Sequence, residues 1–190
     1  MAEYTQHECT EQIVDAAPDA AIVANLGTAA KILATVEERD LNFYMKGAMG
    51  LTTPVANGLA MQIDRDVVAI EGDGGLIMSM GGLATLSRND PANLTVVVMN
   101  NRTFTTTGGQ KSLSDAIDLQ AVAAGSNLDA HHATNPEEFA TAFEAAQAHD
   151  GTSVVVADVT STQPDEHPDI DYPHAYQKHR FRQAVTGGDD

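Results

Sequence analysis

The residues best suited to metal and phosphate chemistry are an aspartate set among glycines and a pair of asparagines. Gly72-Asp73-Gly74-Gly75 directly follows the apolar run VVAIE, and Asn100-Asn101 ends the next apolar run, LTVVVMN. Carboxylate and carboxamide oxygens, completed by a backbone carbonyl and phosphate oxygens, give the octahedral shell that Mg²⁺ prefers. Glycines also let the backbone approach a phosphate at the start of a helix, where free N–H groups favour an anion. The pattern therefore predicts a metal-bridged diphosphate site.

Either motif alone has an ordinary alternative. Gly-Asp-Gly is a common tight turn and Asn-Asn is a common strand exit, so neither is diagnostic by itself. Together the two motifs indicate a binding site, because they stand at the ends of two consecutive apolar runs. If both runs are strands of one parallel sheet, the two motifs meet at the same edge.

Strands and helices alternate along the chain. Apolar runs rich in valine predict buried strands at Ala21–Asn25, Val67–Glu71, Leu94–Asn100 and Ser153–Val159. Helical patterns occupy Leu51–Ile63, Leu76–Arg88, Asp115–Ala124 and Pro136–His149, the last with Asn135 as its N-cap. This alternation predicts an α/β fold, a mainly parallel sheet with helices on both faces. Ligands of such a sheet bind at the carboxyl ends of its strands.

The last thirty residues differ in character from the rest. We expect a single domain over residues 1–160 and a C-terminal arm over residues 161–190, because prolines and histidines gather there: Pro164, His167, Pro168, Pro173, His174 and His179. A short helix is expected near Ala175–Ala184. A solvated arm is the favoured interpretation of these histidines, and contact with a neighbouring subunit is the alternative.

Composition narrows the class of protein further. The 190 residues are 43% hydrophobic and 19% charged, as in a globular domain. Twenty-seven acidic against 10 basic side chains give a net charge of -17, which disfavours nucleic acid and anionic membranes as partners. This charge and the scarcity of lysine predict a halophilic source. Lacking a long apolar run or a signal-like start, the protein is expected to be cytoplasmic.

The single cysteine, Cys9, excludes an internal disulfide and an iron–sulfur cluster ligated by this chain alone. We expect it to pack as a small apolar residue on the first helix.

Four segments in order resemble the thiamine diphosphate enzymes. They are NLGT at Asn25–Thr28, NFYMKGAMG at Asn42–Gly50, the GDGG and NN pair, and TTTGGQ at Thr105–Gln110. The resemblance is to the diphosphate-binding domain of that family, and more narrowly to the β subunits of sulfopyruvate decarboxylases and the matching half of phosphonopyruvate decarboxylases. It covers roughly residues 20–159.

Carried onto this sequence, the resemblance implies a thiamine diphosphate and Mg²⁺ site. The metal would be bound by the side chains of Asp73 and Asn101 and by the backbone carbonyl of Thr103. The diphosphate would be held by Thr28, Gly72, Gly74 and Gly75.

The GAMG segment looks like the part of the family that binds the pyrimidine ring. Gly47 would accept a hydrogen bond from the 4′-amino group through its carbonyl, and Met49 would be the apolar wedge beneath the bent cofactor. The alternative for Met49 is ordinary core packing at the start of a helix.

TTTGGQ is expected over the reactive end of the cofactor. Thr106, Thr107 and the N–H groups of Gly108 and Gly109 could form an anion-binding nest for an acidic substrate, with Thr107 counted as catalytic alongside Gly47 and Met49. The same TGGQ occurs in β subunits of 2-oxoacid:ferredoxin oxidoreductases, and a purely structural glycine turn is the alternative.

Other polar residues are weaker candidates for a role in catalysis or substrate binding. His131-His132 is expected in an Ala-rich stretch before a helix, away from the site. Lys46 and Arg102 flank the motifs, and they either attract an acidic substrate or lie on the surface.

The resemblance also implies that a second domain, absent from this sequence, completes the active site. In the family, the glutamate that activates the cofactor comes from a separate pyrimidine-binding domain. The chain is therefore expected to be inactive alone, as the β subunit of a two-subunit 2-oxo acid decarboxylase whose α subunit carries that glutamate, in an α₂β₂ or higher hetero-oligomer.

The expected reaction converts 3-sulfopyruvate to sulfoacetaldehyde, a precursor of coenzyme M, and CO₂, with phosphonopyruvate or another acidic 2-oxo acid left open. The alternatives are a 2-oxoacid:ferredoxin oxidoreductase β subunit and a non-catalytic thiamine-diphosphate-binding subunit.

Overall fold

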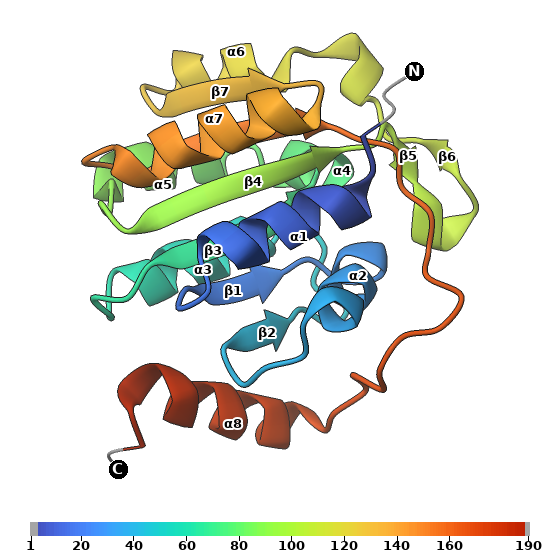
Figure 1. Cartoon of the computed structure of the whole chain (residues 1–190). Coiled ribbons are helices and arrows are strands. Elements are labelled where there is room, and N and C mark those ends of the chain that lie inside the picture. Colours follow the sequence, from blue (N-terminus) through green and yellow to red (C-terminus); the bar gives the residue numbers. More distant parts are fainter. Residues whose placement is uncertain (1–3, 189–190) are drawn as a thin grey trace.

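The structure, a computed structural model, describes residues 4–188 and contains one six-stranded sheet (Figure 1). Every strand pair in this sheet is parallel, and the strand order is β2-β1-β3-β4-β8-β7. The strands are β1 (Ala21–Ala24), β2 (Asn42–Tyr44), β3 (Val67–Gly72), β4 (Leu94–Asn100), β7 (Asp129–Ala133) and β8 (Ser153–Asp158). The expected α/β fold with a mainly parallel sheet is confirmed.

Helices cover both faces of the sheet, as predicted. One face carries α1 (Gln6–Ala16), α2 (Thr28–Val36) and α7 (Pro136–Ala148), and the other carries α3 (Thr52–Ala60), α4 (Asp73–Met78), α5 (Gly82–Asn89) and α6 (Leu119–Gly125). Because successive strand residues point to opposite faces, Ile70 joins the first apolar cluster and Ala69 the second. Burial on both faces explains why the strands are continuous apolar runs.

The starts of α1 and α7 follow local capping signals. Asn135 accepts a hydrogen bond from the N–H of Glu138 at the start of α7, confirming it as the N-cap. Thr5 and Glu8 form a capping box at the start of α1. Cys9 is fully buried on α1 within the first apolar cluster, so its expected packing is also confirmed.

Two helix predictions need correction. The expected helix Leu76–Arg88 is two helices: α4 starts earlier, at Asp73, and ends at Met78, and α5 follows after a break containing Gly81. Glycine weakens a helix interior, which accounts for the break. The expected helix Asp115–Ala124 is a 3₁₀ turn at Ser114–Ala116 followed by α6, whose N-cap is Asp118.

Two strands of the six-stranded sheet were missed, and one of them contains the paired histidines. His131 and His132 lie in β7, which pairs with β8, rather than in a stretch leading to a helix. β2 is only three residues long and pairs with β1. Neither segment carries a long β-branched run, so their strand conformation comes from pairing with neighbours that do.

The C-terminal segment passes the carboxyl ends of the strands and ends in a helix beside the β2 edge of the sheet (Figure 1). The chain bridges Thr160 to Thr5, then runs without helix or strand to α8 (His174–Thr186). α8 packs beside β2, where Phe181 and Phe43 lie 5.2 Å apart between ring centroids. The expected short helix is confirmed, and its position protects the edge strand from pairing with another chain.

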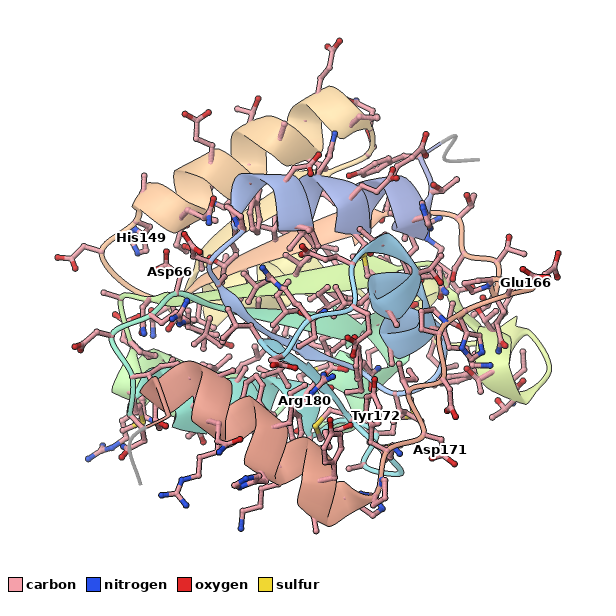
Figure 2. The ribbon with its side chains drawn as sticks, turned by 60° about the horizontal axis from the view of Figure 1, so that its bottom comes forward. Asp66, His149, Glu166, Asp171, Tyr172 and Arg180 are labelled. Carbon is pink, nitrogen blue, oxygen red and sulfur yellow. The ribbon has the colours of Figure 1, made fainter. Side chains whose placement is uncertain are left out.

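Arg180 anchors this helix to the body of the protein. From α8 it points toward the sheet beside Tyr172, with its guanidinium 4.8 Å from that ring centroid (Figure 2). It donates to the Glu38 carboxylate at 2.6 Å and to the carbonyls of Arg39 and Asn42.

The tail histidines His167, His174 and His179 are exposed in the single chain, which fits both a solvated arm and contact with a neighbouring subunit. The division of the chain at residue 160 stays a prediction. Among residues 4–188, no helix has the length and apolar character needed to cross a membrane.

Candidate active site

A cavity of about 150 Å³ lies where β1, β3 and β4 end. From β1 the chain goes to β2 on one side, and it then crosses to β3 on the other side of β1. The strand order therefore reverses between β1 and β3, next to this cavity. Ligands of open α/β sheets bind at such points. The cavity is lined by Gln6, Asn25, Leu26, Thr28, Ala29, Met49, Gly72–Gly75, Met99, Asn101 and Thr103–Thr107.

The register of the sheet brings the two polar motifs together. β3 and β4 pair with Gly72 opposite Met99, so Asp73 and Asn101 leave the sheet side by side and both line the cavity. Asn100 does not line it. Its amide instead donates to the Asp158 carboxylate at 2.6 Å. Of the asparagine pair, Asn101 lines the cavity and Asn100 links β4 to β8.

Asp73 is a buried carboxylate, 3% exposed, at the first position of α4. Its Oδ1 accepts a hydrogen bond from the N–H of Gly74 at 2.7 Å. Its Oδ2 accepts from the N–H of Arg102 at 2.8 Å and from the hydroxyls of Ser112 and Ser114 at 2.5 and 2.8 Å. The carboxylate is therefore held in one orientation from two sides.

Asn101 shapes the turn that follows β4. Its Oδ1 accepts from the N–H of Thr103 at 3.0 Å, and its Nδ2 donates to Oγ1 of Thr105 at 3.2 Å. Arg102 between them has φ of 61°, a left-handed conformation that turns its N–H toward Asp73.

The donor set suits a hard cation that shares its shell with phosphate. Among the described residues, no group of three or more His, Cys, Asp or Glu side chains could hold a metal ion. Asp73 supplies one carboxylate, and Asn101 and Thr103 supply neutral oxygens beside it on the same cavity wall. This set leaves room for anionic oxygens from a ligand, as Mg²⁺ requires.

The glycines after Asp73 are required by packing as well as by ligand access. A Cβ on Gly74 would lie 2.2 Å from Cε1 of Phe104, and one on Gly75 would lie 2.3 Å from Oε1 of Glu71. Neither position can take a side chain unless its neighbour moves.

Thr28 has an unsatisfied polar atom in the cavity wall. Its Oγ1 is buried and has no hydrogen-bond partner within residues 4–188. Thr28 opens α2 after Gly27, and a Cβ on Gly27 would lie 2.4 Å from Oγ1 of Thr106. An orphaned hydroxyl at a helix start that faces a cavity is suited to an anionic ligand oxygen.

The GAMG segment reaches the cavity through Met49 alone. Met49 lines the cavity and belongs to neither buried apolar cluster, so it is not ordinary core. Gly47 has φ of 62° and lines a neighbouring hollow instead. Gly50 packs tightly on α4, since a Cβ there would lie 3.2 Å from the carbonyl oxygen of Gly75.

TTTGGQ forms the tip of a small hairpin beyond the sheet (Figure 1). β5 (Thr103–Phe104) and β6 (Gln110–Lys111) pair antiparallel around a 3₁₀ turn at Thr105–Thr107. Thr106 and Thr107 line the cavity, whereas Gly108 and Gly109 are exposed and lie outside its wall. The N–H of Gly109 donates to the carbonyl of Phe104, so it is already used within the hairpin.

The other charged candidates lie away from the cavity wall. Lys46 donates to the Asp171 carboxylate at 2.7 Å and to the carbonyl of Tyr172 at 2.6 Å. Arg102 pairs with Asp158 at 2.9 Å through its side chain. His131 contacts Asp129, and His132 lies 3.4 Å from Asp158.

Glu71 does not line the cavity but supports its wall from behind, and the sequence analysis missed it. It is fully buried, and burial raises the pKa of its carboxyl to about 7. Its Oε1 accepts from the N–H of Gly72 at 3.0 Å, and its Oε2 accepts from the N–H and hydroxyl of Thr53 at 3.3 Å. Glu71 thus joins the start of α3 to the turn that carries Asp73. Its one sequence signal is an acidic residue at the end of an apolar strand.

Ser112 and Ser114 were also missed. They lie 39 and 41 positions from Asp73 in a polar loop with no motif of its own, so only the folded structure shows their contact.

Known proteins resemble this chain in sequence and fold. Residues 23–157 match the family described as "Thiamine pyrophosphate enzyme, C-terminal TPP binding domain". The "Sulfopyruvate decarboxylase subunit beta" of Methanococcus maripaludis is 32% identical over 183 residues, covering 96% of this chain and 98% of that protein. A "Phosphonopyruvate decarboxylase" of Streptomyces viridochromogenes is 42% identical over 138 residues, covering 72% of this chain but 35% of that protein.

The fold has solved counterparts. The benzoylformate decarboxylase of Polynucleobacter necessarius superposes with a TM-score of 0.70 at 20% identity, over 86% of this chain and 34% of that one. At that identity the likeness concerns the fold.

Proposed function

The chain belongs to the thiamine pyrophosphate enzymes, and from that membership we propose that it is the β subunit of a two-subunit decarboxylase acting on 3-sulfopyruvate. The observation that carries the proposal is its 32% identity to a sulfopyruvate decarboxylase β subunit across nearly the full length of both chains. The cavity supports it, because Asp73, Asn101 and Thr28 line it together and are residue types that suit a metal-bound diphosphate.

The polar wall of the cavity would hold the cofactor. Asp73 and Asn101 would ligate Mg²⁺ through their side chains and Thr103 through its carbonyl. The diphosphate would lie against the orphaned hydroxyl of Thr28 and the backbone of Gly72, Gly74 and Gly75. When bound, thiamine diphosphate supplies a carbon nucleophile and an acceptor for the electron pair released with CO₂.

The apolar wall would set the shape of the cofactor. Met49 lines the cavity and would support the cofactor from below. The carbonyl of Gly47 would accept from the aminopyrimidine, outside the part of the cavity that this chain encloses.

The hairpin would face the substrate. Thr106 and Thr107 line the cavity, and their hydroxyls would bind the distal acidic group, with the N–H of Gly108 beside them at the hairpin tip. The hydroxyls carry most of this role, because the N–H of Gly109 already bonds to Phe104. In the reaction, the C–C bond to the carboxylate breaks, CO₂ leaves, and a proton takes its place on the carbonyl carbon of sulfoacetaldehyde.

A partner subunit would complete the site. An apolar patch formed by Leu51, Val55 and Met78 adjoins Met49, and these side chains are 40% to 64% exposed. The Cγ of Met78 approaches Gly50, which places the patch beside the cavity. The similar phosphonopyruvate decarboxylase is almost three times as long as the matched region, so it carries additional protein in the same polypeptide. We propose that an α subunit bearing the pyrimidine-binding domain and its glutamate covers this patch.

The test is CO₂ release by the chain co-expressed with its α subunit, in high salt with Mg²⁺ and thiamine diphosphate. We expect turnover of 3-sulfopyruvate above phosphonopyruvate and pyruvate, its loss in Asp73→Ala, and its retention in Asp171→Ala, which removes an exposed carboxylate outside the cavity. Turnover only with an added electron acceptor would support the oxidoreductase alternative. Cofactor binding without any turnover would support a non-catalytic subunit.

A further inference from the structure

The two oxygens of the Asp73 carboxylate accept different numbers of hydrogen bonds. Oδ2 accepts three hydrogen bonds, from the N–H of Arg102 and the hydroxyls of Ser112 and Ser114, whereas Oδ1 accepts one, from the N–H of Gly74. A carboxylate offers about four lone-pair positions over its two oxygens. Oδ2 is therefore saturated, and Oδ1 is the oxygen with a position left for a metal ion.

We propose that Ser112 and Ser114 are positioning residues that hold the Asp73 carboxylate for metal binding and tie the substrate-facing hairpin to it. This inference rests on the proposed function, in which Asp73 binds Mg²⁺. The serines would bind neither metal nor substrate. They would act through Asp73, whose Oδ1 is left for the ion when Oδ2 is engaged.

The hairpin geometry supports the second part of the inference. The N–H of Ser112 donates to the carbonyl of Arg102, which closes the base of the hairpin that carries Thr106 and Thr107. Both legs of that base then bond to Oδ2, one through the N–H of Arg102 and the other through the serine hydroxyls. The position of the hairpin is thereby coupled to the metal-binding carboxylate.

The backbone between the serines is shaped for this contact. Leu113 has φ of 71° and is 66% exposed, whereas Ser112 and Ser114 on either side of it are buried. A left-handed conformation is unfavourable for leucine and persists only where the surroundings hold it. Here it turns both hydroxyls inward to one carboxylate oxygen.

Loss of either hydroxyl should weaken metal binding more than it weakens the fold. Residues that orient a metal ligand typically change metal affinity by about 10- to 100-fold when they are mutated. We expect about a 10-fold higher Kd for the metal in Ser112→Ala and in Ser114→Ala. We also expect a higher KM for the 2-oxo acid, because the hairpin is released from Asp73.

Ser153 provides a matched control. It is fully buried and its hydroxyl donates to the Asp129 carboxylate at 2.7 Å, a contact at the start of β8, where Ser153 pairs with Asp129 of β7. Ser153→Ala thus removes the same kind of hydrogen bond without touching Asp73. Ser114→Thr keeps the hydroxyl and serves as the conservative variant.

The experiment measures binding of Mn²⁺, as the probe ion, to the two-subunit protein with thiamine diphosphate present, by the loss of the free-ion paramagnetic resonance signal. Thermal unfolding without metal is recorded for every variant. The inference predicts weaker Mn²⁺ binding in both serine-to-alanine variants, near wild-type binding in Ser114→Thr, and unchanged binding in Ser153→Ala.

Several outcomes would overturn it. Wild-type affinity in both alanine variants would refute the positioning role while leaving the proposed function intact. An equal loss in Ser153→Ala would show that general destabilisation causes the effect. If the wild-type protein binds no Mn²⁺ with the cofactor, the proposed function itself fails and the inference with it.

Discussion

Replacing Gly74 with alanine tests how the cavity is built. A Cβ at this position would lie 2.2 Å from Cε1 and 2.9 Å from Cζ of Phe104, where ordinary contact begins at 3.4 Å. The ring would have to retreat by about 1 Å, since packed interiors hold no spare space. Phe104 directly precedes the turn Thr105–Thr107 in the cavity wall, so the wall would move with the ring.

Two opposing effects set the magnitude for stability. Alanine favours a helix over glycine by about 0.5–1 kcal/mol. Overpacking costs about 1–3 kcal/mol, and the lower half of that range applies because Phe104 is only partly buried. We therefore expect a net loss of about 1 kcal/mol, which lowers the melting temperature by roughly 2–4 °C in a chain of this size.

The effect on function should be larger. A displacement of about 1 Å in a catalytic constellation costs on the order of 100-fold in turnover. Decarboxylation by the Gly74→Ala protein with its α subunit should fall by about that factor, and thiamine diphosphate should bind more weakly.

Gly58→Ala is the matched control, because Gly58 lies within α3 and a Cβ there meets nothing within 4 Å. Gly58→Ala should gain only the helix propensity of alanine, without overpacking, and should therefore melt at a higher temperature than wild type. Phe104→Ala in the Gly74→Ala background should restore part of the lost stability by removing the obstructing ring. The reasoning is refuted if Gly74→Ala melts higher, as Gly58→Ala should, and retains wild-type turnover.

Three further predictions concern the buried polar groups and the apolar patch. Burial raises the pKa of the Glu71 carboxyl from 4.5 to about 7, so the folded state binds the proton more tightly, and the stability of the metal-free protein should fall as pH rises from about 4.5 to 7. The thermal unfolding of Glu71→Gln should lack this fall in stability, and an identical pH profile in both proteins would contradict the prediction. Thr28→Val removes the orphaned hydroxyl, so calorimetry should show about 1 kcal/mol more stability without cofactor and weaker cofactor binding; unchanged cofactor affinity would exclude Thr28 from the site. Leu51→Glu should weaken association with the α subunit by at least about 10-fold in a binding assay, whereas Met61→Glu, equally exposed at the other end of α3, should not; equal effects of the two would argue against the patch as the contact.

The sequence predicted the strands whose burial shows in their own composition. β3, β4 and β8 are apolar runs rich in valine, because both of their faces are covered by helices. β7 is Asp-Ala-His-His-Ala, and nothing in that composition indicates a strand. It forms because β8 offers a free parallel edge, which is a tertiary property that no local pattern records.

The sequence likewise predicted only some of the contacts in the candidate site. Asp73 and Asn101 could be placed together in advance, since both follow adjacent parallel strands, and the register from Val67 opposite Leu94 to Gly72 opposite Met99 confirms the reasoning. The contacts of Ser112 and Ser114 with Asp73 could not, because they depend on how a hairpin of about ten residues folds back over α4. Glu71 was hidden by its place within a strand whose other members are apolar.

The proposal that this chain is half of a split decarboxylase is tested most directly by mixing the separately purified chain and α subunit with Mg²⁺, thiamine diphosphate and 3-sulfopyruvate. CO₂ release should be absent from either subunit alone, should rise with added α subunit until it saturates, and should disappear with Asp73→Ala. Full activity from the chain alone, or activity that survives Asp73→Ala, would contradict the account.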